Sequence, residues 1–349
     1  MEIRYEWTPY LPVNGIPMKE IHAILERLRR DPNVPRALGT LVSVEGSSYR
    51  RVGARLLIDG SGTSLGSISG GCLESDVIER AKAVIEDGQA QVAVYNTTDE
   101  NDLVWGTGTG CNGVVRILIE RLPATPGWAQ TLSRNLAARK ITRLGVVWDS
   151  TDAGLLGTHE LGSISGRLPA ESVVFEDEIA PPVRLLLFGA GDDAQPLARM
   201  AKELGWQVEV ADARPASATA ARFSGADKVA VSRPEDAASV PLDAWTVAVI
   251  MTHRYRDDVA LLRALLPRDI SYVGLLGPKK REQKILAELA TDGFKVTAEM
   301  RARLHAPVGL DLGGDTPEQV ALAILAEIQS SLAARDARPL RERDRPIHA

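Results

Sequence analysis

The stretch that most constrains the fold of this chain runs from Leu185 to Asp212. It opens with four consecutive apolar residues, as expected for a parallel strand covered on both faces. Gly189, Gly191 and Ala194 then take the small-residue positions of a G-x-G-x-x-G/A turn, which lets a phosphate approach the backbone. A helix and a second strand follow, and they deliver Asp212 where an acid can hold a ribose hydroxyl. The pattern predicts a nucleotide-binding α/β unit; the alternative is a doubly wound domain without a bound dinucleotide.

Alternation of strands and helices continues after this turn through KVAVS, WTVAVIMTH and SYVGLLG, which predicts a doubly wound parallel sheet. Ligands bind such sheets beyond the carboxyl ends of the strands. His253 follows one strand, and Lys279 and Lys280 follow another at the start of a helix whose dipole favours an anion. We therefore expect these three side chains on the ligand-binding side. A hydrogen-bonded structural histidine and solvated lysines are the alternatives.

Two glycine-rich stretches in the first half of the chain each contain one of its two cysteines. Gly70 and Gly71 precede Cys72, which is placed near the start of a predicted helix, where the helix dipole favours a thiolate. Gly110 and Cys111 belong to WGTGTGCNG, which we interpret as a loop folded against a ligand, since glycine is costly to order. A small buried cysteine and a structural bulge are the alternatives. Two thiols without a nearby histidine make a poor zinc site, so no metal site is expected.

The length of 349 residues indicates two domains, because single hydrophobic cores stop growing at about 250–300 residues. The fold class that we expect is α/β. We expect an N-terminal α+β domain over 18–165, a linker over 166–182, a Rossmann-like doubly wound parallel-sheet domain over 183–334 and a flexible tail over 335–349.

Composition narrows the classes of function. The net charge of −5 gives no reason to expect a nucleic-acid partner. No apolar run approaches the ~20 residues that a membrane span needs, and the first residues do not resemble a signal peptide. Two cysteines make a disulfide framework unexpected. These features favour a cytoplasmic protein.

Several motifs taken together resemble the XdhC/CoxI family of xanthine dehydrogenase accessory proteins. Besides the stretch ending at Asp212, they are VEGSSYRRVGARLLID, GSISGGCLE, WGTGTGCNG, YVGLLGPKKR and LHAPVGLDLGGDTPEQVALAILAEI. The resemblance implies a chaperone that binds molybdenum cofactor (molybdopterin, as mononucleotide or dinucleotide) and protects it while its terminal sulfur is installed. The implied partners are a cysteine desulfurase and a molybdenum hydroxylase apoenzyme. Cys72 and Cys111 would then handle the cofactor or its sulfur, and the turn at Gly189 would bind a dinucleotide or a pterin phosphate.

The glycine turn departs from the family pattern, which often has a histidine after the second glycine. This chain has Asp192 and Asp193 there, and two carboxylates repel a phosphate placed close by. We therefore expect a ligand held elsewhere along the crevice, or a cation that accompanies the phosphate. The alternative functions are an NAD(P)-dependent oxidoreductase, indicated by the glycine turn and Asp212, and a scaffold that joins desulfurase to apoenzyme. A maturation chaperone is favoured over a turnover enzyme, and a homodimer is a further expectation.

Overall fold

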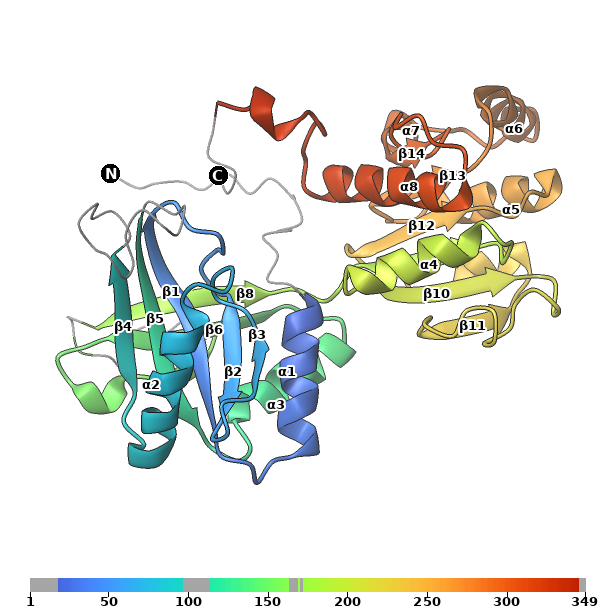
Figure 1. Cartoon of the computed structure of the whole chain (residues 1–349). Coiled ribbons are helices and arrows are strands. Elements are labelled where there is room, and N and C mark those ends of the chain that lie inside the picture. The colour runs from blue at the N-terminus through green and yellow to red at the C-terminus, as the bar shows by residue number, and fades with distance from the viewer. Residues whose placement is uncertain (1–17, 97–112, 163–168, 170–171, 345–349) are drawn as a thin grey trace. The chain divides into compact units, whose positions relative to one another are not determined.

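The computed structural model describes residues 18–96, 113–162, 169 and 172–344 (Figure 1). The chain divides into two compact units, and the division falls between Pro181 and Pro182.

The N-terminal unit contains a five-stranded antiparallel sheet in the order β3-β2-β1-β5-β4. Its strands are β1 (Arg36–Gly46), β2 (Arg55–Asp59), β3 (Ser64–Gly66), β4 (Gln91–Asn96) and β5 (Gly113–Leu122). Successive side chains of a strand point to opposite faces. Leu56 and Ile58 pack with helix α2 (Glu74–Asp87). Leu57 instead packs with residues of α1 (Met18–Arg30) and α3 (Gly127–Ala137).

A second sheet of this unit has the order β7-β6-β8, with β6 (Thr142–Asp149), β7 (His159–Leu161) and β8 (Val173–Ile179). Strand β8 lies inside 166–182, the stretch for which the sequence predicts a linker. Asp177 of this strand accepts a hydrogen bond of 2.8 Å from the buried guanidinium of Arg55. Because both side chains of this ion pair are largely buried, strand β8 is part of the folded N-terminal unit and not a linker. A short 3-10 turn, η2 (Ala153–Leu155), precedes β7.

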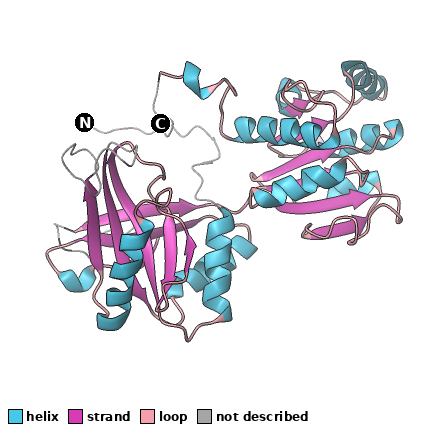
Figure 2. Ribbon diagram, viewed as in Figure 1, coloured by secondary structure: helices cyan, strands magenta, loops and turns pink. Residues whose placement is uncertain are grey.

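The C-terminal unit is a six-stranded parallel sheet in the order β11-β10-β9-β12-β13-β14, which confirms the predicted Rossmann-like fold. The strands are β9 (Arg184–Phe188), β10 (Gln207–Asp212), β11 (Lys228–Val231), β12 (Thr246–Ile250), β13 (Tyr272–Leu275) and β14 (Leu304–His305). The helices are α4 (Ala194–Glu203), α5 (Tyr255–Leu265), α6 (Lys279–Thr291), α7 (Ala298–Arg303) and α8 (Pro317–Leu332), with 3-10 turns η3 (Pro234–Ser239) and η4 (Leu340–Glu342) (Figure 2).

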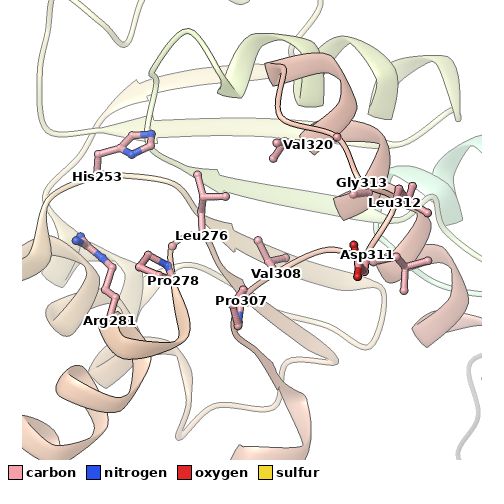
Figure 3. A pocket seen from close by; sticks show the side chains of 14 residues that line it. His253, Leu276, Pro278, Arg281, Pro307, Val308, Asp311, Leu312, Gly313 and Val320 are labelled. Atoms are coloured by element: carbon pink, nitrogen blue, oxygen red, sulfur yellow. The ribbon is translucent and has the colours of Figure 1, made fainter.

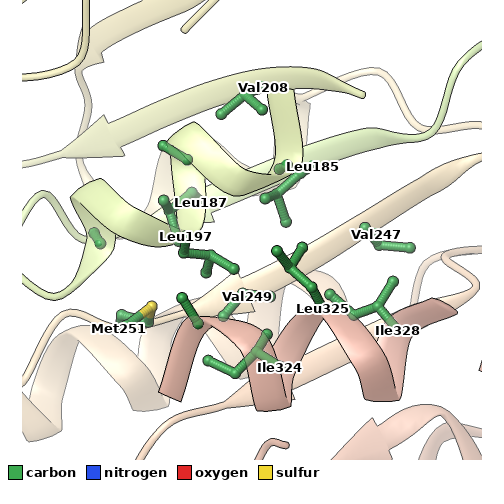
Figure 4. Packing of buried hydrophobic residues seen from close by; sticks show 14 of the residues in the cluster. Leu185, Leu187, Leu197, Val208, Val247, Val249, Met251, Ile324, Leu325 and Ile328 are labelled. Carbon is green, nitrogen blue, oxygen red and sulfur yellow. The ribbon is translucent and has the colours of Figure 1, made fainter. Parts of the chain in front are cut away.

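The apolar run of β9 is buried on both faces, as predicted. Leu185 and Leu187 pack in one core cluster with residues of α4 and α8 (Figure 4). Leu186 and Phe188 pack in another cluster with residues of α5 and α6. Burying one such side chain contributes about 1.5–3 kcal/mol, so the continuous apolar sequence follows from helices on both sides of the sheet.

Helix α8 begins at the capping box that the sequence predicts. The Thr316 hydroxyl accepts a hydrogen bond of 3.4 Å from the backbone N–H of Gln319. In return, the side-chain Oε1 of Gln319 accepts one of 3.2 Å from the backbone N–H of Thr316. Of the predicted tail, 335–344 is described and contains η4. Among the described residues, no helix has the length and apolarity needed to cross a bilayer.

Candidate functional site

The carboxyl ends of β9 and β12 mark the point where the strand order reverses, which is where doubly wound sheets bind ligands. The glycine turn follows β9. Gly189 has φ +114°, and a Cβ built on it would lie 2.2 Å from the carbonyl oxygen of Met251, just after β12. Only glycine fits here, because the two loops of the chain touch backbone to backbone. The second glycine, Gly191, is confined by a side chain, since its Cβ would lie 2.5 Å from Oδ1 of Asp193.

Asp212 lies at the end of β10 with both carboxylate oxygens bound to the chain itself. Oδ2 accepts a hydrogen bond of 2.8 Å from the backbone N–H of Ala190 in the glycine turn. Arg214 donates three more, from its backbone N–H and its Nε to Oδ1 and from Nη2 to Oδ2. Burial by itself raises the pKa of Asp212, but these hydrogen bonds outweigh burial and hold the pKa below its ordinary value. Asp212 therefore stabilises the turn and carries a full set of donors.

The two acids of the glycine turn are each paired with a basic side chain from a different side. Nη2 of Arg222 lies 2.8 Å from Oδ1 of Asp192. Nε2 of His253 lies 2.7 Å from Oδ2 of Asp193. His253 has φ +58°, the left-handed conformation that costs a residue with a side chain about 1–2 kcal/mol. A strained residue after β12 thus reaches across to the turn after β9.

A pocket of about 470 Å³ opens beside His253, at the carboxyl ends of β12 and β13 (Figure 3). Its volume is within the range of about 300–1,000 Å³ that small-molecule sites occupy. Polar groups come from His253, Arg281 and Asp311. The remaining wall is apolar or glycine: Leu276, Gly277, Pro278, Pro307, Val308, Leu310, Leu312, Gly313, Gly314, Val320 and Ala323. The pocket combines apolar surface with a few polar groups, which suits a ligand that has a ring and an anionic end.

One wall of this pocket is the loop between β14 and α8, and Glu327 of α8 anchors it. Its Oε2 accepts a hydrogen bond of 2.9 Å from the backbone N–H of Gly309 and another from the hydroxyl of Tyr272. Nδ1 of His305 lies 3.3 Å from the Oε1 atom, and the rings of His305 and Tyr272 stack at 4.1 Å. Burial acts to raise the pKa of Glu327, but the hydrogen bonds from these three residues lower it overall.

The structure separates the cations of the segment that begins α6. Lys279 and Lys280 occupy the first two positions of the helix, are exposed, and are absent from the pocket lining. Arg281 lines the pocket, and its Nε donates a hydrogen bond of 2.8 Å to the buried carboxylate of Asp258. The sequence placed Arg281 beside the two lysines at the start of this helix but did not single it out as a site residue, although a side chain that faces the sheet is expected once per helical turn.

In the N-terminal unit, the exposed residues Gly70, Gly71 and Cys72 precede α2, which begins at Glu74 rather than at the cysteine. Glu74 Oε1 accepts hydrogen bonds from the backbone N–H of Ile68 at 3.3 Å and from that of Ser69 at 2.9 Å. Its Oε2 accepts one from the backbone N–H of Gly71 at 3.1 Å and one from the Ser69 hydroxyl. This carboxylate fixes the loop that carries Cys72, and sequence reasoning did not select it.

The predicted site residues Gly110 and Cys111 lie outside the described residues. Within the described ranges, no group of three or more His, Cys, Asp or Glu side chains is arranged to hold a metal ion.

The fold is that of a Rossmann-type unit with a pocket at the carboxyl ends of its strands, joined to an N-terminal α+β unit. Residues 185–328 match the XdhC Rossmann domain, and residues 30–96 match the XdhC and CoxI family. The chain belongs to the XdhC/CoxI family, which confirms the predicted resemblance.

Individual relatives align along most of the chain. It is 33% identical over 334 residues to a Bacillus subtilis protein named as a probable subunit of xanthine dehydrogenase, covering 89% of this chain and 97% of that protein. It is 25% identical over 293 residues to the molybdenum cofactor insertion chaperone PaoD of Escherichia coli, covering 84% and 82%. A crystal structure described as a xanthine dehydrogenase from Bacillus halodurans superposes with a TM-score of 0.76 at 30% identity, covering 93% of this chain and 98% of that one.

Proposed function

We propose that this chain binds molybdenum cofactor and acts as a maturation chaperone for a molybdenum hydroxylase of the xanthine dehydrogenase type. The observation that carries the proposal is the relationship to PaoD, named a molybdenum cofactor insertion chaperone, over 84% of this chain. The Bacillus subtilis relative, whose name refers to xanthine dehydrogenase, supports the client class. The pocket beside His253 is the candidate place for the cofactor.

The residues of this pocket fit a pterin that carries a phosphate. Leu276, Val308 and Val320 offer apolar surface to a flat ring. The Asp311 carboxylate can accept hydrogen bonds from ring amino groups, and Arg281 and His253 stand at one end (Figure 3). Each of these two basic side chains also contacts a carboxylate of the chain, Asp258 and Asp193, so a phosphate there would share them with these acids. Bound cofactor supplies the molybdenum chemistry of the client hydroxylase. The role of this chain is to hold the ring, neutralise the phosphate and limit the access of water.

The sulfur-handling role is proposed for Cys72, and Cys111 is the second candidate. Cys72 is exposed on a loop that the Glu74 hydrogen bonds hold in place, so a partner protein can reach its Sγ atom. In the proposed step, the Cys72 thiolate attacks the terminal sulfur of a cysteine desulfurase persulfide. A new S–S bond forms at Cys72, the S–S bond of the donor breaks, and the desulfurase thiolate leaves. Delivery to the apoenzyme, a cytoplasmic location and a homodimer complete the proposal.

The test is the pterin and molybdenum content of the protein purified from a molybdenum-replete host. We expect up to one pterin per chain in the wild type. Leu312 lines the pocket and is 54% exposed, whereas Leu322 of α8 is 50% exposed and is absent from the lining. Leu312→Glu should therefore lose the pterin, and the matched control Leu322→Glu should retain it. Wild-type protein without pterin that also fails to activate a hydroxylase would contradict the proposal.

The second candidate function is an NAD(P)-dependent oxidoreductase, which the strand order and the glycine turn favour. The hydrogen bonds that already fill Asp212 oppose it. Titration with NADH and NADPH distinguishes the two candidates, because saturable enhancement of nucleotide fluorescence would favour the oxidoreductase.

A further inference from the structure

Two hollows of very different size lie on either side of the point where the strand order reverses. The pocket beside His253 measures about 470 Å³. The hollow on the other side is lined by Asp212, Arg233 and Arg254 among others, and measures about 20 Å³. A cavity needs about 10–15 Å³ to hold one water molecule, so the second hollow has room for little more than a single water. Of these two hollows in the described part of the chain, the one beside His253 is much the larger.

The small hollow lies where a dinucleotide would place its nucleoside half, next to the acid at the end of the second strand. A carboxylate accepts about four hydrogen bonds. Asp212 accepts four within this chain, one from Ala190 and three from Arg214. These four hydrogen bonds use the acceptor positions with which Asp212 would hold a ribose hydroxyl, and two of them come from the guanidinium of Arg214.

Two ion pairs lie beside the glycine turn, and each has an exposed side chain, Asp192 in one and His253 in the other. Arg222 donates to the carbonyl oxygen of Ala190 at 3.3 Å and to Asp192 at 2.8 Å, on the β10 side. Asp193 binds His253 on the β12 side. A pyrophosphate crossing from one half of the crevice to the other would have to displace both contacts.

We infer that this crevice takes a compact ligand with a single phosphate, held on the β12–β14 side, and excludes the nucleoside half of a dinucleotide through Arg214. The identity of the ligand as a pterin rests on the proposed function. The exclusion of the nucleoside half does not rest on the proposed function, because this exclusion follows from the contacts of Asp212 and from the volumes of the two hollows. Arg214 is thus a specificity-determining residue.

The first test uses ADP-ribose as a probe for the nucleoside half, titrated into the full chain by calorimetry. Wild-type protein should give no saturable binding. Arg214→Ala removes the guanidinium and should bind ADP-ribose saturably, with an affinity about tenfold or more above the detection limit of the wild-type titration. Arg214→Gln is a second variant with the same expectation. Arg263→Ala changes an exposed arginine of α5 that does not line the hollow; it is the control and should behave as the wild type. Saturable binding to the wild type, or none to a folded Arg214 variant, would overturn the inference.

The second test measures nucleotide released on acid hydrolysis of the purified protein, alongside its pterin. We expect pterin without an equimolar nucleoside monophosphate. Equimolar nucleotide would overturn the inference and leave the proposed function standing. A complete lack of pterin would count against the proposed function, and the ADP-ribose titration would still decide the inference.

Discussion

Oδ2 of Asp193 lies 2.7 Å from Nε2 of His253, although the two residues are 60 positions apart in the chain. The contact joins the residue just before α4 to the loop after β12, across the point where the sheet reverses its strand order. It also gives the aspartate at this position of the glycine turn a basic partner from the chain itself. The left-handed conformation of His253 is the backbone cost of the contact.

That backbone cost can be measured with two variants of His253. Both His253→Gly and His253→Ala lose the hydrogen bond to Asp193, so their difference isolates the conformation at φ +58°. Glycine adopts this conformation freely, and we expect His253→Gly to be more stable than His253→Ala by about 1 kcal/mol in urea unfolding. Equal stabilities, or a more stable alanine variant, would show that the conformation carries no cost.

Gly189 should not tolerate even a methyl group. In Gly189→Ala the new Cβ meets the Met251 carbonyl oxygen, a backbone atom that cannot move alone. We expect a loss of about 3 kcal/mol or more in the free energy of unfolding. The matched control is Gly225→Ala, where the nearest atom is the Lys202 side chain at 3.9 Å; it should change stability by about 0.5 kcal/mol or less. Similar losses in both variants would contradict the close approach of the two loops.

Glu74 should control the order of the loop that carries Cys72. Glu74→Gln weakens the acceptor of the Ser69 and Gly71 amides, and hydrogen–deuterium exchange should show faster exchange at both. Glu79→Gln, on an exposed position of the same helix, is the control and should leave these amides protected. Unchanged exchange in Glu74→Gln would mean that other contacts hold the loop.

The same carboxylate should make stability depend on pH in the acid range. Burial acts to raise the pKa of Glu74, but hydrogen bonds led by those from Ser69 hold it below its ordinary value of 4.5. A lowered folded pKa contributes stability above pH 4.5, and this contribution is lost as the pH falls through the folded value. The free energy of unfolding of the wild type should therefore exceed that of Glu74→Gln by about 1–2 kcal/mol at pH 7, and this difference should vanish in acid. A gap that widens on acidification would reverse the sign of the shift.

Glu327 should support the pocket without touching the ligand. Glu327→Leu leaves the Gly309 amide and the Tyr272 hydroxyl without their acceptor, which costs about 1–3 kcal/mol for each buried group left unpaired. We expect a lower unfolding free energy together with reduced pterin retention. Glu318→Leu, exposed in the first turn of the same helix, is the control and should retain pterin. Full pterin retention in Glu327→Leu would show that the hydrogen bonds of Glu327 to this loop are not needed for pterin binding.

The C-terminal fold could be predicted from the sequence, because its signals are local. The apolar run at Leu185, the glycine turn and the capping box at Thr316 each depend on neighbours within a few residues, and each is present where predicted. The family followed from motifs in order along the chain. The sequence predicted a linker where strand β8 lies. The strand could not be foreseen from its neighbours, because Arg55, the partner of Asp177, lies 122 positions away in the chain.

The partners of the site residues, and which side chains line the pocket, became known only from the folded chain. The sequence placed Asp212 and His253 at the carboxyl ends of strands. It could not show that Arg214 donates hydrogen bonds to Asp212, or that His253 contacts Asp193. It selected Lys279 and Lys280, whereas Arg281 lines the pocket. Spacing along the chain fixes which end of the sheet a residue occupies. Partners and pocket volume depend on side chains that meet from distant segments, and those meetings exist only in the folded chain.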